Sequence, residues 1–422
     1  MNYQETIDYL FHATPVFEHI GASAYKPGLQ TTVALDNHYG NPHHSYQTIH
    51  VAGTNGKGSC SHAIASVLQE CGYKVGLYTS PHLRDFRERI RVNGTPVSKA
   101  FVVSFVEDYI SWNNASATPL HPSFFELTTA MALKYFAEEK VDIAVIEVGL
   151  GGRLDCTNII TPILSVITNI SFDHTQLLGS SLSAIATEKA GIIKRGVPVI
   201  VGEAVDETRP VFQEKARSEN APLFWAEDMK DDEWIHLPFE LKGDYQEHNR
   251  RTVSCALKRL DEAGIITWKT SKDDKVVADG LRNICRNTGL EGRWQTIRKE
   301  PLVICDTGHN VAGWQFLSRQ IMRQPCKKLR MVFGMVDDKD LDTVLSLLPP
   351  KADYYFTQAQ SKRAIPASEI FSRAKLHGLH GRTFGSVEEA YAAALADAES
   401  LDFIFVGGSS YVVADFLTTL PL

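Results

Sequence analysis

The stretch that decides the fold reads TIHVAGTNGKGSCSHAIASVLQ at residues 48–69. A short apolar, β-rich run leads into glycines, and a helical pattern follows. In such a strand–turn–helix unit, backbone amides and the helix N-terminus point at an anion, and Lys57 can reach its outer phosphates. The segment 53–59, GTNGKGS, therefore predicts a phosphate-binding loop.

The spacing in this loop departs from the standard pattern. Thr54 and Asn55 alone separate Gly53 from Gly56, and Gly58 stands between Lys57 and Ser59. A glycine-rich turn that merely joins a strand to a helix is the alternative interpretation. Polar residues at the ends of neighbouring strands are needed to decide between the two.

From residue 48 onward, β-rich runs alternate with amphipathic segments, which is typical of an α/β protein with a mostly parallel sheet. We expect the strands of the first series at 48–52, 74–78, 141–148, 163–168 and 198–201. We expect its helices at 57–71, 124–140, 182–193, 207–220 and 247–263. Residues 228–240 interrupt the pattern and read as an insertion or an edge hairpin.

A second α/β series begins at residue 302, with strands expected at 302–305, 329–333, 353–357 and 403–406. Residues 298–301, RKEP, read as the linker between the two series. We therefore expect an ATPase domain of the P-loop type over residues 1–297 and a smaller Rossmann-like α/β domain over residues 298–422. A chain of 422 residues is long enough for two such cores.

Composition narrows the class of protein. The net charge of −7 and the lack of basic runs argue against a nucleic-acid partner. No apolar stretch is long enough for a membrane span, and the N-terminus lacks the pattern of a secretory signal. Seven scattered cysteines form neither a zinc motif nor a disulfide framework. We expect a cytoplasmic protein, by default a monomer.

Three predicted strands end in polar groups that suit a metal ion. Glu147 follows one apolar run, Asp173 and His174 follow another, and Ser80 follows a third. Ligands of open α/β sheets bind outside these carboxyl ends. Each residue alone reads equally well as a solvated or structural side chain. Together, beside a phosphate loop, they predict a Mg²⁺ site completed by water and phosphate oxygens.

The chain resembles the folylpolyglutamate synthase and dihydrofolate synthase family, relatives of the Mur ligases. The resemblance rests on ordered segments that run over most of the chain. They are YKPGL (25–29), GTNGKGS (53–59), TSPHL (79–83), ERIRVNG (88–94), FFELTT (124–129), EVGLGGRLDCTN (147–158), TNISFDHTQLLG (168–179), EKAGIIK (188–194), GDYQEHN (243–249), EGR (291–293), DTGHN (306–310), DKD (338–340) and GGSSYVV (407–413). In place of DTGHN the family usually has DGAHN.

The resemblance implies roles for single residues. The loop residues Gly53, Thr54, Asn55, Gly56, Lys57, Gly58 and Ser59 would bind ATP, together with Asn249, Arg293, Asp306, His309 and Asn310. Ser80, Glu147 and His174 would hold the metal ion. Lys57, His174 and Lys189 would take part in catalysis, with Lys189 carbamylated. From spacing alone, Lys189 reads as a surface lysine.

The implied reaction joins L-glutamate to a pterin carboxylate. ATP and Mg²⁺ would turn the carboxylate of dihydropteroate or of a folyl-glutamate into an acyl phosphate, which the glutamate amine then attacks. Phe124 and Phe125 are candidate pterin contacts, although core packing is the more frequent role of such residues. Arg84 is a candidate carboxylate ligand or else half of an ion pair. Two hypotheses compete with this reaction. One is a P-loop kinase or NTPase that acts on a small molecule, and the other is a nucleotide-binding module without catalytic activity.

Overall fold

The computed structural model describes residues 1–12, 14, 28–229, 232–267, 274–337 and 339–420. Residues 25–27 of the YKPGL segment and residue 338 of the DKD segment therefore lie outside the described residues. Contacts divide the chain into two compact units. Unit 1 comprises residues 1–82, 86–240 and 248–290, and unit 2 comprises residues 83–85, 241–247 and 291–422.

Unit 1 is built on a sheet of eight strands, in the order β4-β3-β2-β5-β1-β6-β7-β8. The strands are β1 (Gln47–Ala52), β2 (Val75–Tyr78), β3 (Ile90–Val92), β4 (Thr95–Pro96), β5 (Ile143–Glu147), β6 (Leu164–Ile167), β7 (Val199–Val201) and β8 (Leu223–Trp225). The pairs that join β2, β5, β1, β6, β7 and β8 are parallel, whereas β3 and β4 form an antiparallel edge. The mostly parallel sheet expected from the sequence is confirmed.

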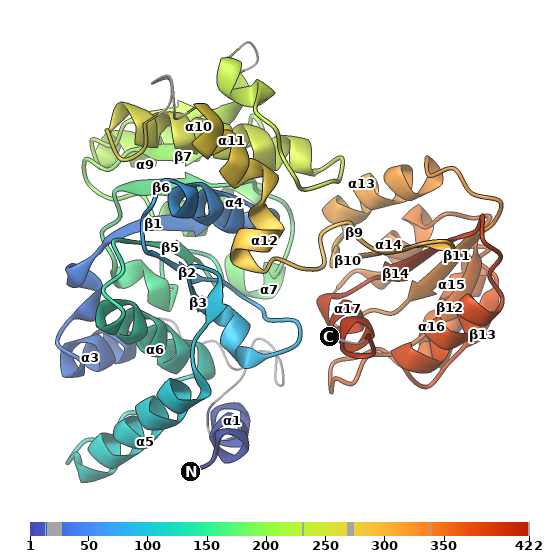
Figure 1. Cartoon of the computed structure of the whole chain (residues 1–422), viewed down its shortest axis with the longest axis horizontal. Coiled ribbons are helices and arrows are strands. Elements are labelled where there is room, and N and C mark those ends of the chain that lie inside the picture. Colours follow the sequence, from blue (N-terminus) through green and yellow to red (C-terminus); the bar gives the residue numbers. More distant parts are fainter. Residues whose placement is uncertain (13, 15–27, 230–231, 268–273, 338, 421–422) are drawn as a thin grey trace. The chain divides into compact units, whose positions relative to one another are not determined.

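Helices cover both faces of this sheet (Figure 1). They are α1 (Tyr3–His12), α3 (Gln30–His38), α4 (Lys57–Glu70), α5 (Lys99–Ala115), α6 (Phe124–Glu138), α7 (Thr175–Leu178), α8 (Leu182–Ala190), α9 (Arg209–Ser218), α10 (Gln246–Glu262), α11 (Asp274–Arg282) and α12 (Ile284–Thr288). α4 packs against α11 and α12, and α6 packs against α3 on the other side of the sheet. Ser123 and Glu126 form a capping box that starts α6, which is why the apolar run begins its helix at Phe124.

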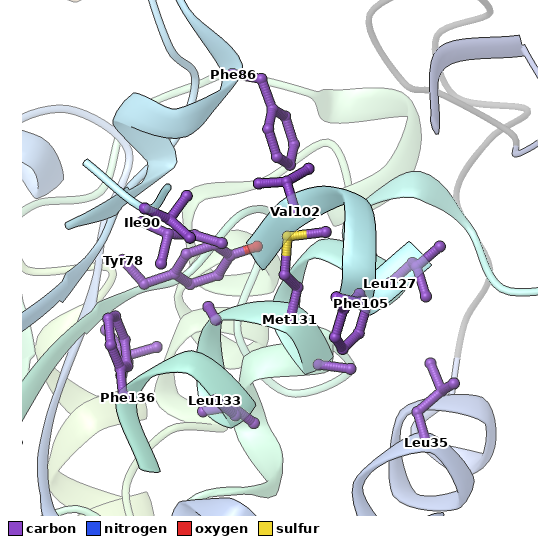
Figure 2. Close-up of a cluster of buried hydrophobic side chains, with 14 of the residues drawn as sticks. Leu35, Tyr78, Phe86, Ile90, Val102, Phe105, Leu127, Met131, Leu133 and Phe136 are labelled. Carbon is purple, nitrogen blue, oxygen red and sulfur yellow. The ribbon is translucent and has the colours of Figure 1, made fainter. Parts of the chain in front are cut away.

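The core beneath α6 is a cluster of buried apolar side chains from β2, β3, α5 and α6 (Figure 2). Tyr78, Phe105, Met131 and Phe136 are among its fully buried members. Burial of apolar surface on this scale is the main favourable term in folding. The cluster fixes β2 and β5, whose carboxyl ends carry Ser80 and Glu147.

Unit 2 contains a six-stranded sheet in the order β13-β12-β11-β14-β10-β9. Its strands are β9 (Gln295–Lys299), β10 (Leu302–Asp306), β11 (Leu329–Phe333), β12 (Asp353–Phe356), β13 (Gly381–Thr383) and β14 (Phe403–Gly407). Its helices are α13 (Val311–Met322), α14 (Leu341–Leu347), α15 (Ala367–Leu376), α16 (Val387–Ala396) and α17 (Ser410–Thr418). One apolar cluster packs α13, α14 and α15 on one face, and another packs α16 and α17 on the other. This is the smaller α/β domain that the sequence predicts.

The domain boundary differs from the expected one. The chain passes from unit 1 to unit 2 between Leu290 and Glu291, so the expected break at 297/298 falls inside β9. Residues 298–301 are not a linker, because β9 and β10 pair as an antiparallel hairpin around them. Charged residues on an exposed edge strand read like a linker in the sequence.

The described residues of the stretch 228–240 form no hairpin strands. Two short 3₁₀ helices occur there instead, the end of η5 (Ala226–Met229) and η6 (Glu233–His236). Asp232 caps the second helix through the amide of Trp234, and the Trp234 side chain is buried. Three further 3₁₀ helices are η2 (Pro42–Ser45), η3 (Phe86–Arg89) and η4 (Cys156–Ile159).

A buried ion pair holds the middle of the unit 2 sheet. Arg330 on β11 donates to Asp402, just before β14, at 2.9 Å, and the two side chains are 6% and 3% exposed. We expect Asp402→Ala to lower the free energy of unfolding by about 3 kcal/mol, because the buried guanidinium loses its most buried partner and keeps only Asp353, at 3.3 Å, as a charged one. Chemical denaturation measures this change.

The exposed pair of Lys327 and Glu399 supplies the control, with side chains 61% and 67% exposed. Glu399→Ala should cost less than about 1 kcal/mol, since water screens such pairs. Equal losses in the two variants would contradict the account of the buried pair.

Candidate active site

The loop between β1 and α4 depends on its glycines. Gly53 and Gly56 have φ angles of 146° and 84°, in the region that favours glycine. A Cβ atom on Gly53 would lie 1.8 Å from Thr168 Oγ1, and one on Gly56 would lie 2.1 Å from Asn249 Oδ1. The loop is therefore closely packed on both sides, and larger residues do not fit at either position.

A second loop, which follows β6, fastens the first. Asn55 N donates to Asn169 Oδ1 at 2.9 Å, and Thr168 Oγ1 donates to the carbonyl of Asn55 at 2.5 Å. Thr54 Oγ1 accepts from the amide of Ser171 at 3.1 Å. These contacts hold the backbone of the loop in one conformation, as electrostatic stabilisation of a transferring phosphoryl group requires.

Two lysine ammonium groups converge on one carbonyl of this loop. Lys57 Nζ lies 3.1 Å from the carbonyl oxygen of Gly53, and Lys189 Nζ lies 2.8 Å from the same atom. Lys189 is 4% exposed. Burial, followed by the charge of Lys57, lowers the pKa of Lys189 to about 7. The surface-lysine interpretation of Lys189 is therefore wrong, and two cationic groups at one point favour an anionic ligand.

Two of the proposed metal ligands, Ser80 and Glu147, lie at the carboxyl ends of the adjacent strands β2 and β5, whereas His174 follows β6, on the other side of β1. Glu147 ends β5, pairs in register with Val51 of β1, and is 3% exposed. Its Oε2 accepts the amide of Ser80 at 3.2 Å, so the structure brings Glu147 and Ser80 together. His174 has a φ of 49° and stands at the N-terminus of α7.

The donor set fits a hard cation that keeps much of its water. Within the described ranges, no three His, Cys, Asp or Glu side chains are grouped closely enough to form a metal site by themselves. A buried carboxylate and a hydroxyl beside a phosphate loop suit Mg²⁺, which binds few protein groups together with phosphate oxygens and water. These residues would then hold the ion jointly with the nucleotide.

Unit 2 carries the other expected nucleotide contacts. Asp306 ends β10, and its carboxylate accepts from Tyr245 Oη at 2.6 Å and from the Trp294 amide at 2.7 Å. Burial raises the pKa of Asp306. Arg293 donates to the Thr307 hydroxyl, and the His309 ring lies 3.0 Å from the Thr307 carbonyl. The DTGHN segment is thus tied to the EGR segment within this unit.

Two further candidates of unit 2 have structural partners. Asn310 caps α13 by accepting the amide of Gly313 at 2.9 Å. The guanidinium of Arg84 makes a two-point ion pair with Glu291, at 3.1 and 3.0 Å. Of the two interpretations of Arg84, the structure shows the ion pair.

The aromatic candidates of unit 1 divide between core and surface. Phe124 is 4% exposed and packs in the core against Phe86 and Phe11, so core packing is its role in this structure. Phe125 is partly exposed and stacks on Tyr78 at 5.7 Å. A Cβ atom on Gly149 would lie 2.3 Å from the Phe125 ring, which places this ring against the loop that follows Glu147.

Sequence reasoning missed the residues that hold the site together. Thr168 and Asn169 fasten the phosphate loop, and Asp155 and Thr157 order the loop after Glu147. All four stand inside segments that were recognised as motifs. Thr168 and Asn169 directly follow an apolar run, and this position in the sequence could have identified them as site residues.

Comparison with known proteins agrees with this geometry. The sequence profile of the Mur ligase middle domain matches residues 51–261, and that of the "Mur ligase, glutamate ligase domain" matches residues 292–410. A phosphate-loop α/β unit followed by a second α/β unit is thus the architecture of a Mur-type ligase.

Full-length relatives define the family. The chain is 31% identical to the folylpolyglutamate synthase of Lacticaseibacillus casei, over 100% of this chain and 99% of the relative. It belongs to the folylpolyglutamate synthase and dihydrofolate synthase family. The chain spans about half the length of two bifunctional curated relatives that it also matches.

Solved structures show the same fold. The structure of E. coli FolC in complex with DHPP and ADP matches with a TM-score of 0.83 and 29% identity, over 99% of this chain and 97% of that one. The Yersinia pestis bifunctional synthase complexed with AMPPNP and Mn ion matches with a TM-score of 0.82 and 27% identity, over 100% and 98% of the two chains. The fold predicted from the sequence is confirmed.

Proposed function

We propose that the protein is an ATP-dependent ligase that joins L-glutamate to dihydropteroate, to folyl-glutamates, or to both. The convergence of Lys57 and Lys189 on the Gly53 carbonyl carries this proposal. Gly53 follows β1, whose neighbour β5 ends in the buried Glu147. Membership of the family supports the substrates, since relatives and their structures are named for folate ligation and for bound nucleotide.

The chemistry follows from the poor reactivity of a carboxylate. The γ-phosphoryl group of ATP passes to the pterin carboxylate, which gives an acyl phosphate and ADP. The amine of glutamate then attacks the acyl carbon, and phosphate leaves as the amide forms. Neither step needs a covalent nucleophile on the protein. We therefore give the cysteines no catalytic role; all seven are free and four of them are buried.

The chain's own groups position and stabilise the reacting phosphoryl group. The amides of the 53–59 loop and the Lys57 ammonium offset its negative charge. Ser80, Glu147 and His174 would hold Mg²⁺, which acts as a Lewis acid on phosphate oxygens when bound. Asn249 packs beside Gly56 in unit 1, and Arg293, Asp306, His309 and Asn310 of unit 2 stay proposed nucleotide contacts.

Lys189 has a chemical property that fits the modification implied by the family. With a pKa of about 7, a large share of its amine is neutral at neutral pH. A neutral amine adds to CO₂ and forms a carbamate, whereas an ammonium group cannot. Carbamylation would replace one of the two converging cations with an anion suited to a metal ion.

The experiment that tests the function identifies products. The protein is incubated with Mg-ATP, L-glutamate and either dihydropteroate or tetrahydrofolate. The products are then identified from their masses by mass spectrometry. We expect a glutamate amide of at least one pterin, and none when glutamate or Mg²⁺ is omitted. A phosphorylated pterin formed without glutamate would instead support the kinase hypothesis.

We further propose that the protein acts as a monomer in the cytoplasm. All seven cysteines are free, which suits a reducing compartment. Within the described part of the chain, no helix is long and apolar enough to cross a membrane. Light scattering of the purified protein gives the oligomeric state, and a mass twice that of the chain would contradict the monomer.

A further inference from the structure

A chain of three buried polar side chains lies under the loop that follows Glu147. His50, in the middle of β1, places its Nε2 2.8 Å from Thr157 Oγ1, and Thr157 Oγ1 donates to Asp155 Oδ1 at 2.5 Å. The three residues are 0%, 0% and 4% exposed. Polar groups this deep are costly unless they are satisfied, so the arrangement of their protons is strongly constrained.

The direction of each hydrogen bond follows from the chemistry of the groups. The Thr157 hydroxyl has one hydrogen, which it gives to the Asp155 carboxylate, so it must accept from His50. His50 therefore carries its proton on Nε2. Burial lowers the pKa of His50 to about 3, which keeps the ring neutral. Its Nδ1 is buried and has no hydrogen-bond partner among the residues that the structure describes.

Asp155 uses its carboxylate to close the loop of residues 149–155. One oxygen accepts the amide of Leu150 at 2.8 Å, and the other accepts the amide of Thr157 at 3.0 Å. Burial raises the pKa of this carboxyl group, while the hydrogen bonds from Thr157, Leu150 and Gly149 oppose that rise. The carboxylate thus joins the two ends of the loop, which begins two residues after Glu147.

The closed loop in turn lies directly on α8, which carries Lys189. The Arg153 amide donates to the Glu188 carbonyl at 2.7 Å. A Cβ atom on Gly152 would lie 2.8 Å from the Glu188 carbonyl oxygen, and one on Gly191 would lie 2.3 Å from Arg153 Cα. The loop and the α8 segment that carries Lys189 are therefore tightly packed against each other, and a shift of the loop toward α8 would displace that segment.

We propose that His50 and Thr157 are positioning residues for the reaction. By holding the Asp155 carboxylate in one orientation, they fix the 149–155 loop between Glu147 and Lys189, and so set the geometry of the site that receives the phosphoryl group. The inference rests on the proposed function for its kinetic effect. Its structural part, the ordering of the loop, stands independently.

The alternative is that the His–Thr pair only stabilises the fold, and the chain supplies a matched control for it. His62 on α4 places its Nδ1 2.7 Å from Thr288 Oγ1, which donates to the Ile284 carbonyl at 2.6 Å. Thr288 is also 0% exposed. This second pair also joins a buried histidine to a fully buried threonine, but the Thr288 hydroxyl donates to a helix carbonyl and not to a loop carboxylate.

The experiment compares Thr157→Val, Thr157→Ser, Thr288→Val and the unaltered protein. Steady-state kinetics give kcat and KM for each substrate, and hydrogen exchange with mass spectrometry reports the amides of residues 148–158. Thr157→Val should lower kcat about 10- to 100-fold, as the loss of groups that orient metal-site ligands does, with a smaller change in the KM for glutamate. Exchange in the loop should accelerate.

The other variants separate positioning from stability. Thr157→Ser keeps the hydroxyl and should restore both kcat and slow exchange. Thr288→Val should lower the melting temperature, yet leave kcat and exchange in residues 148–158 unchanged. A Thr157→Val protein with wild-type kcat and wild-type exchange would overturn the proposal, as would equal losses of kcat in Thr157→Val and Thr288→Val.

The exchange measurement keeps the two proposals distinguishable. If the unaltered protein forms no glutamate amide, the proposed function fails, and faster loop exchange in Thr157→Val alone still supports the positioning role. If the unaltered protein is active but Thr157→Val leaves the loop exchange slow, the positioning role is rejected and the proposed function stands.

Discussion

Replacing Lys57 with methionine should lower the kcat of glutamate-dependent ADP formation by about 10²–10³-fold, the usual cost of losing one preorganised group that stabilises transition-state charge. The ammonium of Lys57 sits at the first turn of α4, within 3.1–3.2 Å of the Gly53 and Thr54 carbonyls. Methionine replaces the apolar stem of lysine as far as Cε and removes the charged nitrogen. The loss should therefore fall on catalysis, while the circular dichroism spectrum stays unchanged.

A lysine of the same unit serves as the control. Lys275 is exposed on α11, and Lys275→Met removes the same charge from the protein without touching the loop. Its kcat should equal that of the unaltered protein. Near-normal turnover in Lys57→Met would reject the role of Lys57, and a matching loss in Lys275→Met would trace the effect to net charge.

Replacing Lys189 with methionine should change activity and stability in opposite directions. Turnover should fall by at least about 100-fold, because the group that meets the phosphate loop at Gly53 is lost. The free energy of unfolding should rise below pH 7. A pKa of about 7, against 10.5 for a free lysine, corresponds to a burial cost on the order of 5 kcal/mol, partly offset by the lost hydrogen bond.

The effect of Lys189 on the free energy of unfolding depends on pH. Between pH 7 and 10.5 the unfolded chain holds the Lys189 proton and the folded chain does not, so this residue makes stability rise with pH. Below pH 7 both states are protonated and the full cost remains. The stability gained in Lys189→Met should thus be largest below pH 7 and vanish toward pH 10.5, measured by urea denaturation in buffers depleted of CO₂.

Carbamylation of Lys189 can also be tested directly. With bicarbonate present, a high-resolution electron-density map should show an additional carboxyl group on Lys189 Nζ. A bare amine in that map would count against carbamylation. A stability difference between Lys189→Met and the unaltered protein that does not vary with pH would contradict the lowered pKa.

Much of the fold follows from local pattern. The strand at 329–333 was predicted residue for residue, and β1 and α4 begin and end within one residue of the expected bounds. Three short strands were missed. β4 and β9 are partly exposed edge strands and carry no continuous apolar run. β3 is buried, but it has only three residues and one of them is the charged Arg91. The error at residues 298–301 has the same cause.

Candidate site residues could be proposed from the sequence where a residue type alone limits the chemistry. Closely spaced glycines, a lysine after them and a glutamate at the end of an apolar run indicate a phosphate loop and a nearby ligand site. Arg84 and Phe124 could not be settled, since an ion pair with Glu291 and burial beside Phe86 depend on segments far apart in the chain. The burial of Lys189 and the His50–Thr157 contact are likewise tertiary facts.

The most direct test of the central claim follows oxygen from the carboxylate. A pterin substrate labelled with ¹⁸O in its reacting carboxyl group is converted in the presence of Mg-ATP and L-glutamate, and the released phosphate is analysed by mass spectrometry. If the carboxylate is activated as an acyl phosphate, each amide formed leaves one ¹⁸O atom in inorganic phosphate. Unlabelled phosphate, or ADP formed without any glutamate amide, would contradict the account.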